Sequence, residues 1–229
     1  YEIVAAEDII TPDGTVRNQN GEVVDTVTTD ENGTAVSREL YLGKYEVREI
    51  TAPHGMVLNP EPHCVELIYA GQNVAVTETA TSFENERQKV EISLVKSIEK
   101  NERFGIGTNG EMKNISFGLF AAEEIVSASG TSIPANGLVE IISLNEDGTA
   151  KVKTDLPFGS YYVQELATDS HYKLSDTKYP VTFAYAGQDT AVVKIAANDG
   201  KTIGNDLIYG SVSGKKVDEN GNALGGALI

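Results

Sequence analysis

The chain of 229 residues contains no tryptophan, a single cysteine and few cations. The lone cysteine, Cys64, cannot form a disulfide within the chain, so stability must come from packing or from another kind of cross-link. With 34 Asp and Glu against 18 Lys and Arg, the formal net charge is −16. Such a charge opposes extended contact with phosphate backbones or anionic lipid, and we expect no nucleic-acid partner.

Long apolar runs are also missing. No stretch approaches the roughly 20 apolar residues of a membrane helix, and no cationic, apolar leader opens the chain, so we expect no membrane insertion. Tyr1 lies inside a strand-like run, and we therefore expect the sequence to be part of a longer protein. The length suffices for one large domain or two ordinary ones.

Motifs for cofactors, metals and catalysis are weak. Residues 105–110 fit G-x-G-x-x-G, but strand-like residues follow where a dinucleotide site needs a helix, which favours a flexible loop. His54, His63 and Cys64 lack metal-ligand spacing, and the acidic turns lack the later Glu of a calcium loop. Because no G-x-S-x-G setting occurs either, we expect no cofactor, no metal and no enzyme that turns over.

Short alternating runs rich in Val, Thr and Tyr are present throughout, separated by glycine-containing turns at roughly 8- to 12-residue spacing. This pattern predicts an all-β chain of sandwich type. Asn-Gly in residues 30–33 is predicted to supply the positive φ of a tight hairpin, with a returning strand at 35–40. A second hairpin is expected between strands at 65–69 and 74–79.

The chain also repeats itself. The segments YEIVAAED, DENGTA, LGKYEVREI and YAGQ recur in the same order as FGLFAAEE, NEDGTA, FGSYYVQEL and YAGQ. On this alignment Asn85 matches Asn205, and Lys96 matches Lys216. The repeat therefore predicts tandem modules, with residues 84–96 running from the end of one into the start of the next.

Three segments follow from the repeat. We predict a module at residues 1–89 that lacks its first strand, a complete module at 90–209, and the first strand of a third module at 210–229. An unpaired sheet edge is a template for another strand. We therefore expect residues 210–229 to complete the first module of a neighbouring molecule, which would give head-to-tail self-association.

Polar residues fall on faces that the alternation predicts to be buried. Lys96 shares a strand face with Val90, Ile92 and Leu94. In both modules a carboxylate or an amide is the last residue on the apolar face of a predicted strand. These residues are Glu49, Glu165, Asn85 and Asn205. Since burying an unpaired charge costs several kcal/mol, the recurrence of the three residue types indicates one shared site.

A family resemblance is specific at this point. Taken in the order of one repeat, the motifs of the chain are a strand ending in Lys, KVDENG (216–221), TDENGTA (29–35), LGKYEVRE (42–49) before an Ala-Pro pair, and a strand ending in Asn. This order resembles the B-type repeat domains of the collagen adhesin Cna and the SpaA-like pilin domains of Gram-positive surface proteins. The resemblance covers essentially the whole chain, although residues 167–169 read Ala-Thr-Asp where Ala-Pro is usual and residues 97–113 form a long loop.

The resemblance implies tandem Ig-like, prealbumin-like β-sandwich modules, often cross-linked by a spontaneous isopeptide bond. The bond joins the Lys of the first strand to the Asn of the last and is promoted by a Glu. In the complete module these are Lys96, Asn205 and Glu165. For the first module the corresponding residues are Glu49, Asn85 and the tail residue Lys216.

The implied chemistry agrees with burial, because only a neutral amine attacks and burial lowers the pKa of a lysine. A protonated Glu165 is expected to bind the carbonyl oxygen of Asn205, polarise it and pass protons to the departing ammonia. This reaction happens once in each molecule, so it is maturation and not turnover. A buried salt bridge with a hydrogen-bonded amide is the alternative interpretation of Lys96, Glu165 and Asn205.

At the level of the whole chain, we predict a structural stalk or adhesin role outside the cell, among neighbouring repeats of a parent protein that is anchored to the cell wall. Binding of a host-matrix ligand, or a carbohydrate-binding or enzyme-appended module, are the alternatives. The lack of tryptophan disfavours a sugar binder, which needs exposed aromatic platforms, without deciding the matter.

Overall fold

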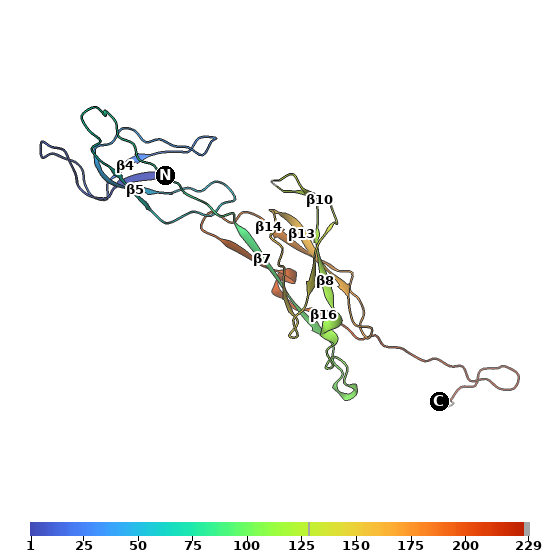
Figure 1. The fold of residues 1–229 in the computed structure, drawn as a ribbon. Coiled ribbons are helices and arrows are strands. Elements are labelled where there is room, and N and C mark those ends of the chain that lie inside the picture. Colours follow the sequence, from blue (N-terminus) through green and yellow to red (C-terminus); the bar gives the residue numbers. More distant parts are fainter. Residues whose placement is uncertain (128, 227–229) are drawn as a thin grey trace. The chain divides into compact units, whose positions relative to one another are not determined.

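The computed structural model describes residues 1–127 and 129–226, and their regular secondary structure consists almost entirely of β-strands (Figure 1). The helical elements among them are three short 3-10 turns: η1 (Glu102–Phe104), η2 (Glu111–Asn114) and η3 (Ala197–Gly200). The all-β prediction is therefore confirmed. None of the described helices is long and apolar enough to cross a membrane.

Contacts divide the chain into two units. The first contains residues 1–91, 155–159 and 182–195, and the second contains 92–154, 160–181 and the residues from 196 onward. Segments 155–159 and 182–195 cluster with the first unit because they bond to it, as the Gln188 carboxamide does with the backbone of Ala52 and Ile50. The module assignment made from the repeat stays a prediction.

The first unit has one four-stranded antiparallel sheet in the order β4-β1-β5-β6. Strands β2 and β3, which lie between β1 and β4 in the chain, form a separate two-stranded hairpin. The strands of the unit are β1 (Glu2–Ala5), β2 (Ile9–Ile10), β3 (Val16–Asn18), β4 (Val23–Thr26), β5 (Gly43–Arg48) and β6 (His63–Leu67). The core contains the inward residues of this sheet and of the hairpin: Ile3, Ala5, Ile9, Val24 and Tyr45.

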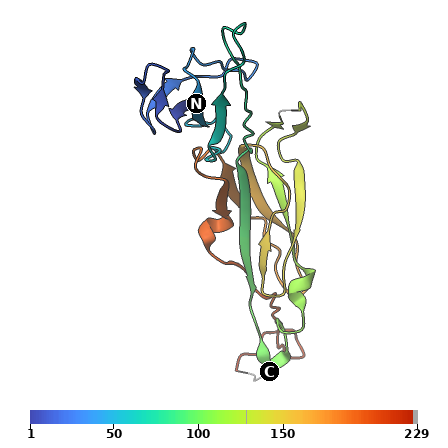
Figure 2. The ribbon, with the colours of Figure 1, turned by 60° about the vertical axis from the view of Figure 1, so that its left-hand side comes forward.

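Residues 89–205, which include most of the second unit, contain two larger sheets (Figure 2). One has the order β11-β8-β13-β14, which repeats the order of the first unit's sheet. Its strands are β8 (Ser116–Ala121), β11 (Leu138–Ser143), β13 (Gly159–Ala167) and β14 (Lys178–Phe183). A separate two-stranded hairpin joins β9 (Ile125–Val126) to β10 (Ser132–Ile133).

The other sheet is organised around β7 (Lys89–Ile98), which pairs with three strands. These are β12 (Thr149–Lys151), β15 (Val192–Ala196) and β16 (Ile203–Asn205). β16 runs parallel to β7, with Ile203 opposite Lys96. The first and last strands of the module are therefore direct neighbours.

The strands predicted at 35–40 and 74–79 do not form in the first unit. In the second unit the matching segments lie at or beside β12 and β15, and both of those strands pair with β7. Residues 1–88, all of them described, contain no strand in the place of β7. A strand needs a partner for its backbone N–H and C=O groups, so the predicted alternation alone does not produce one.

The acidic hairpin turns form as predicted, with one difference. In residues 30–33 only Gly33 has a positive φ, of 75°, while the Asp30 carboxylate accepts the backbone N–H groups of Asn32 and Thr34. Gly148 has the same role in the second unit, with φ 82°. The turn therefore uses glycine for the left-handed residue and aspartate to satisfy the backbone donors.

Residues 210–226 contain no strand. They hold one tight hairpin closed by a bridge between Val217 and Ala223, with Val212 fully exposed. Of the opening strand predicted at 210–229, residues 227–229 lie outside the described residues. Among residues 1–127 and 129–226, the tail from residue 210 onward pairs with no strand.

Candidate functional site: a buried Lys-Glu-Asn cluster

Lys96 points into the core of the second unit from near the C-terminal end of β7. Its neighbours on the same face, Ile92, Leu94 and Ile98, are buried, and Lys96 itself is only 2% exposed. Among the described residues the Nζ atom has no hydrogen-bond partner, and Oε1 of Glu165 lies 3.6 Å away. Burial lowers the pKa of Lys96 from its ordinary value of 10.5, although the Glu165 carboxylate opposes that shift.

Glu165 reaches the same place from β13, which lies in the opposite sheet, and it is 3% exposed. Its Oε2 atom accepts a hydrogen bond of 2.9 Å from the backbone N–H of Ser175. Both carboxylate oxygens also accept from Nδ2 of Asn205, at 2.9 and 3.0 Å. One carboxylate therefore contacts both the amine and the amide that the sequence predicts to react.

Asn205 ends β16 and is 3% exposed. Its Nδ2 atom donates to Glu165 and, at 2.9 Å, to Oγ1 of Thr168. Its Oδ1 atom is buried and has no partner among the described residues. The carboxylate therefore faces the amide nitrogen and not the carbonyl oxygen, which differs from the expectation that Glu165 would polarise that oxygen. The geometry suits protonation of the leaving nitrogen instead.

The sequence did not predict Thr168. A bulge in β13 places Glu165 opposite Phe117 and Ala167 opposite Ser116, so the regular alternation breaks between them. Bulges change the direction of the side chains that follow, and the Thr168 hydroxyl reaches the amide that Glu165 also contacts. The only signal available was that Ala-Thr-Asp replaces the usual Ala-Pro.

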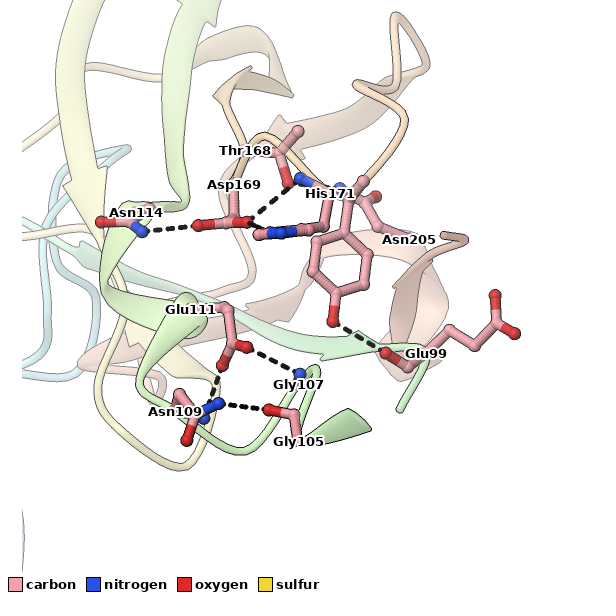
Figure 3. Close-up of polar contacts among 11 residues, drawn as sticks. Glu99, Gly105, Gly107, Asn109, Glu111, Asn114, Thr168, Asp169, His171 and Asn205 are labelled. Carbon is pink, nitrogen blue, oxygen red and sulfur yellow. Dashed lines mark hydrogen bonds and ion pairs between the residues drawn. The ribbon is translucent and has the colours of Figure 1, made fainter. Parts of the chain in front are cut away.

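Asp169 anchors the turn that carries Thr168 (Figure 3). One carboxylate oxygen accepts from the backbone and ring N–H groups of His171, and the other accepts from Nδ2 of Asn114, at 2.7 Å. These bonds hold the pKa of Asp169 below its usual range. Asn114 belongs to η2, so the long loop before β8 helps to fix the turn next to the cluster.

The first unit contains a related pair. Glu49 is 6% exposed, and its Oε2 atom accepts from Nδ2 of Asn85 and from the backbone N–H of Asn59, both at 2.7 Å. Asn85 also donates to the carbonyl oxygen of Val57 at 2.9 Å. The predicted third member, Lys216, is exposed in the tail, and no hydrogen bond or ion pair of the described residues links it to this pair.

The Gly-rich loop is not arranged to bind a dinucleotide phosphate. The backbone N–H groups of Gly107 and Asn109 both donate to the carboxylate of Glu111, at 2.8 and 2.7 Å (Figure 3). The backbone N–H of Glu111 itself, together with these two donors, holds the pKa of that carboxyl group below its usual value. A side chain of the protein therefore occupies the place that a phosphate would need.

Other predicted candidates do not assemble into a site. Within residues 1–127 and 129–226, no group of three His, Cys, Asp or Glu side chains is placed to hold a metal ion. Cys64 is a free, exposed thiol on β6. Of the predicted site residues that the structure describes, Lys96, Glu165 and Asn205 form a buried three-residue cluster.

Two facing sheets, with the last strand running parallel beside the first, define the second unit as a prealbumin-like β-sandwich. The family model of the SpaA prealbumin-like fold domain matches residues 13–82 and 100–201, which together are more than half of the chain. The chain belongs to this family, and the resemblance inferred from its motifs is confirmed.

Individual relatives are more distant. The trypsin-resistant surface T6 protein of Streptococcus pyogenes serotype M6 is 25% identical over 147 residues, which cover 62% of this chain and 26% of that protein. The Bacillus anthracis TIE protein has a similar fold, with a TM-score of 0.50 and 20% identity over 90% of this chain and 30% of that chain. The chain therefore spans less than a third of either relative.

A third similar structure is GBS52, the minor pilin of Streptococcus agalactiae, with a TM-score of 0.35 and 16% identity over 94% of this chain and 85% of that chain.

Proposed function

We propose that this chain is part of the stalk of a Gram-positive cell-surface or pilus protein, outside the cell and among further modules of the same parent. Membership of the SpaA prealbumin-like family supports this role, as does the similarity to the T6 surface protein. In this role the chain transmits force and holds other parts of the parent away from the cell, and it catalyses no turnover reaction.

The proposal includes a covalent cross-link between Lys96 and Asn205. The observation that carries it is the burial of the Lys96 amine without a hydrogen-bond partner, beside a carboxylate that also contacts the Asn205 amide. A buried lysine with a lowered pKa is a nucleophile, and Glu165 is placed to move protons.

The reaction is balanced within the cluster. Lys96 gives a proton to Glu165, and the neutral amine attacks Cγ of Asn205. A new C–N bond forms, the Cγ–Nδ2 bond breaks, and Glu165 passes its proton to the departing nitrogen while it takes one from the attacking amine. The products are an amide bond between the side chains and one ammonia.

The bond would join β7 to β16, the first and last strands of the second unit. A force applied to the two ends of the module would then pass through the cross-link and not stretch the sheets between them. The alternative is an ion pair of Lys96 and Glu165 that never reacts. Intact-mass measurement distinguishes the two, since the bond removes one ammonia from the chain.

Head-to-tail contact through residues 210–229 is a further proposal about partners. The pair of Glu49 and Asn85 has no lysine beside it in the described chain, and the tail carries Lys216 without a partner strand. A covalent ladder of dimers and higher species on denaturing gels, lost in Lys216→Ala, would support it. Gels that show monomer alone would rule out a covalent bond between neighbouring molecules at this contact.

A further inference from the structure

We propose that Thr168 is a positioning residue for the cross-link: its hydroxyl fixes the Asn205 carboxamide so that the leaving nitrogen faces Glu165. This inference rests on the proposed isopeptide bond and adds to it a residue outside the Lys-Glu-Asn set. Thr168 contacts a reacting group, but it gives and takes no proton in the scheme.

The hydrogen bonds of the amide nitrogen carry the argument. Nδ2 of Asn205 has two hydrogens, and each has an acceptor: the Glu165 carboxylate takes one, and Oγ1 of Thr168, 2.9 Å away, takes the other. Rotation of the carboxamide by half a turn would bring Oδ1 into that position and separate the nitrogen from the proton donor. The Glu165 carboxylate opposes this rotation because it can only accept, and the Thr168 hydroxyl holds the plane of the carboxamide by accepting its second hydrogen.

The first unit provides an internal comparison. On the repeat alignment, Thr168 corresponds to Ala52, which has no hydroxyl. There the second acceptor for the amide nitrogen of Asn85 is a backbone carbonyl, that of Val57. Both units therefore hold the amide nitrogen with a glutamate and one further oxygen, and only the source of that oxygen differs.

The surroundings of Thr168 also suit a positioning role. Asp169 follows it directly and is bonded to Asn114 of η2 and to His171, so the backbone beside Thr168 is held at two points (Figure 3). On the repeat alignment Asp169 replaces Pro53 of the first unit. The two departures of the second unit from the family pattern, Thr-Asp and the long loop, thus meet in one hydrogen-bonded group.

The test follows the loss of ammonia over time. The full chain is taken into denaturant directly after cell-free synthesis, refolded by dilution, and sampled for intact mass. We expect Thr168→Val to slow the loss about tenfold, the effect of one lost hydrogen bond in the reacting geometry. Thr168→Ser should restore most of the rate. Thr182→Val, an exposed threonine of β14, is the matched control and should react as wild type does.

A second readout separates positioning from a loss of structure. Because Thr168 acts on the leaving nitrogen and not on the amine, Thr168→Val should lower the rate by the same factor at every pH and leave the shape of the pH profile unchanged. Thr168→Ala, which copies the residue of the first unit, supplies the same test if the valine variant folds poorly.

The outcomes are distinct. Equal rates for wild type, Thr168→Val and Thr168→Ala would overturn the positioning role and leave the cross-link standing. A Thr168→Ser variant as slow as Thr168→Val would also overturn it, because a hydroxyl at that place would then not matter. A wild-type chain that never loses ammonia would overturn the cross-link and, with it, this inference.

Discussion

The Nζ atom of Lys96 lies 3.6 Å from Oε1 of Glu165, and solvent reaches neither side chain. A buried ion pair of this kind is weak evidence for stability, because desolvation of the two charges offsets much of their attraction. In the proposed cross-linking reaction, this pair is the starting state, from which one proton transfer gives a neutral amine and a carboxylic acid beside Asn205.

The first prediction concerns Glu165→Gln. The side chain keeps its size and an acceptor for Ser175 N–H, so the second unit should fold, but it can no longer move protons and the bond should not form. Loss of the cross-link should lower the melting temperature, since closing a loop of roughly 100 residues is worth about 4 to 5 kcal/mol on the loop-entropy model.

The matched control for this variant is Glu140→Gln, a carboxylate of β11 that likewise accepts backbone N–H groups, from Lys153 and Thr154. It should cross-link completely. If Glu165→Gln lost ammonia at the wild-type rate, the proton-transfer role of Glu165 would be wrong.

The second prediction is a pH dependence. The pKa of Lys96 is lowered in the fold, so its neutral, reactive form appears at a lower pH than the 10.5 of an exposed lysine. In the proposed scheme the neutral Lys96 and the protonated Glu165 share a single proton, so the rate of ammonia loss should stay level while the pair holds that proton. It should fall at a pH below 10.5, where the lowered pKa of Lys96 lets the pair lose the proton that the leaving nitrogen needs. Refolding at a series of pH values, followed by intact mass, measures this profile. A rate that keeps rising through pH 10.5 would contradict a scheme in which the pair must hold its shared proton.

The third prediction tests the packing around Lys96. Gly148 has φ 82°, and a Cβ atom there would overlap the carbonyl oxygen of Lys96. Its own carbonyl accepts the N–H of Lys96. Gly148→Ala should therefore disturb the pairing of β12 with β7 and lower both stability and cross-linking.

Gly33 is the control for this change, because it occupies the matching turn of the first unit with φ 75° and has open space around it. Gly33→Ala should cost only the left-handed strain, about 1–2 kcal/mol. Thermal unfolding of both variants checks this. Equal losses would mean that the contact with Lys96 has no effect.

The fourth prediction concerns the loop between β7 and β8, which is shorter than the predicted loop at 97–113 because residues 97 and 98 belong to β7. Glu111 accepts N–H groups from Gly107 and Asn109, so Glu111→Ala should open the loop and make it the first site of limited proteolysis. Glu102→Ala, an exposed glutamate of the same loop, should be cut at the wild-type rate. Mass analysis of early fragments locates the cut. Cleavage that begins inside β7 would contradict this account.

Much of the cluster could be predicted because it depends on strand parity. Lys96 follows Ile92 and Leu94 on one face, and that face is buried. Thr168 could not be predicted, because the bulge after Glu165 breaks the parity on which such reasoning depends. The strands expected at 35–40 and 74–79 were wrong for a related reason: their formation depends on a partner strand, which a local pattern does not contain.

The most direct test of the central claim is the intact mass of the purified, denatured wild-type chain beside that of Lys96→Ala. The account predicts that wild type is lighter than its sequence mass by one ammonia, that Lys96→Ala has its full sequence mass, and that a peptide linking Lys96 to Asn205 appears after digestion. A wild-type chain of full sequence mass would show that Lys96 and Glu165 form a buried ion pair and nothing more.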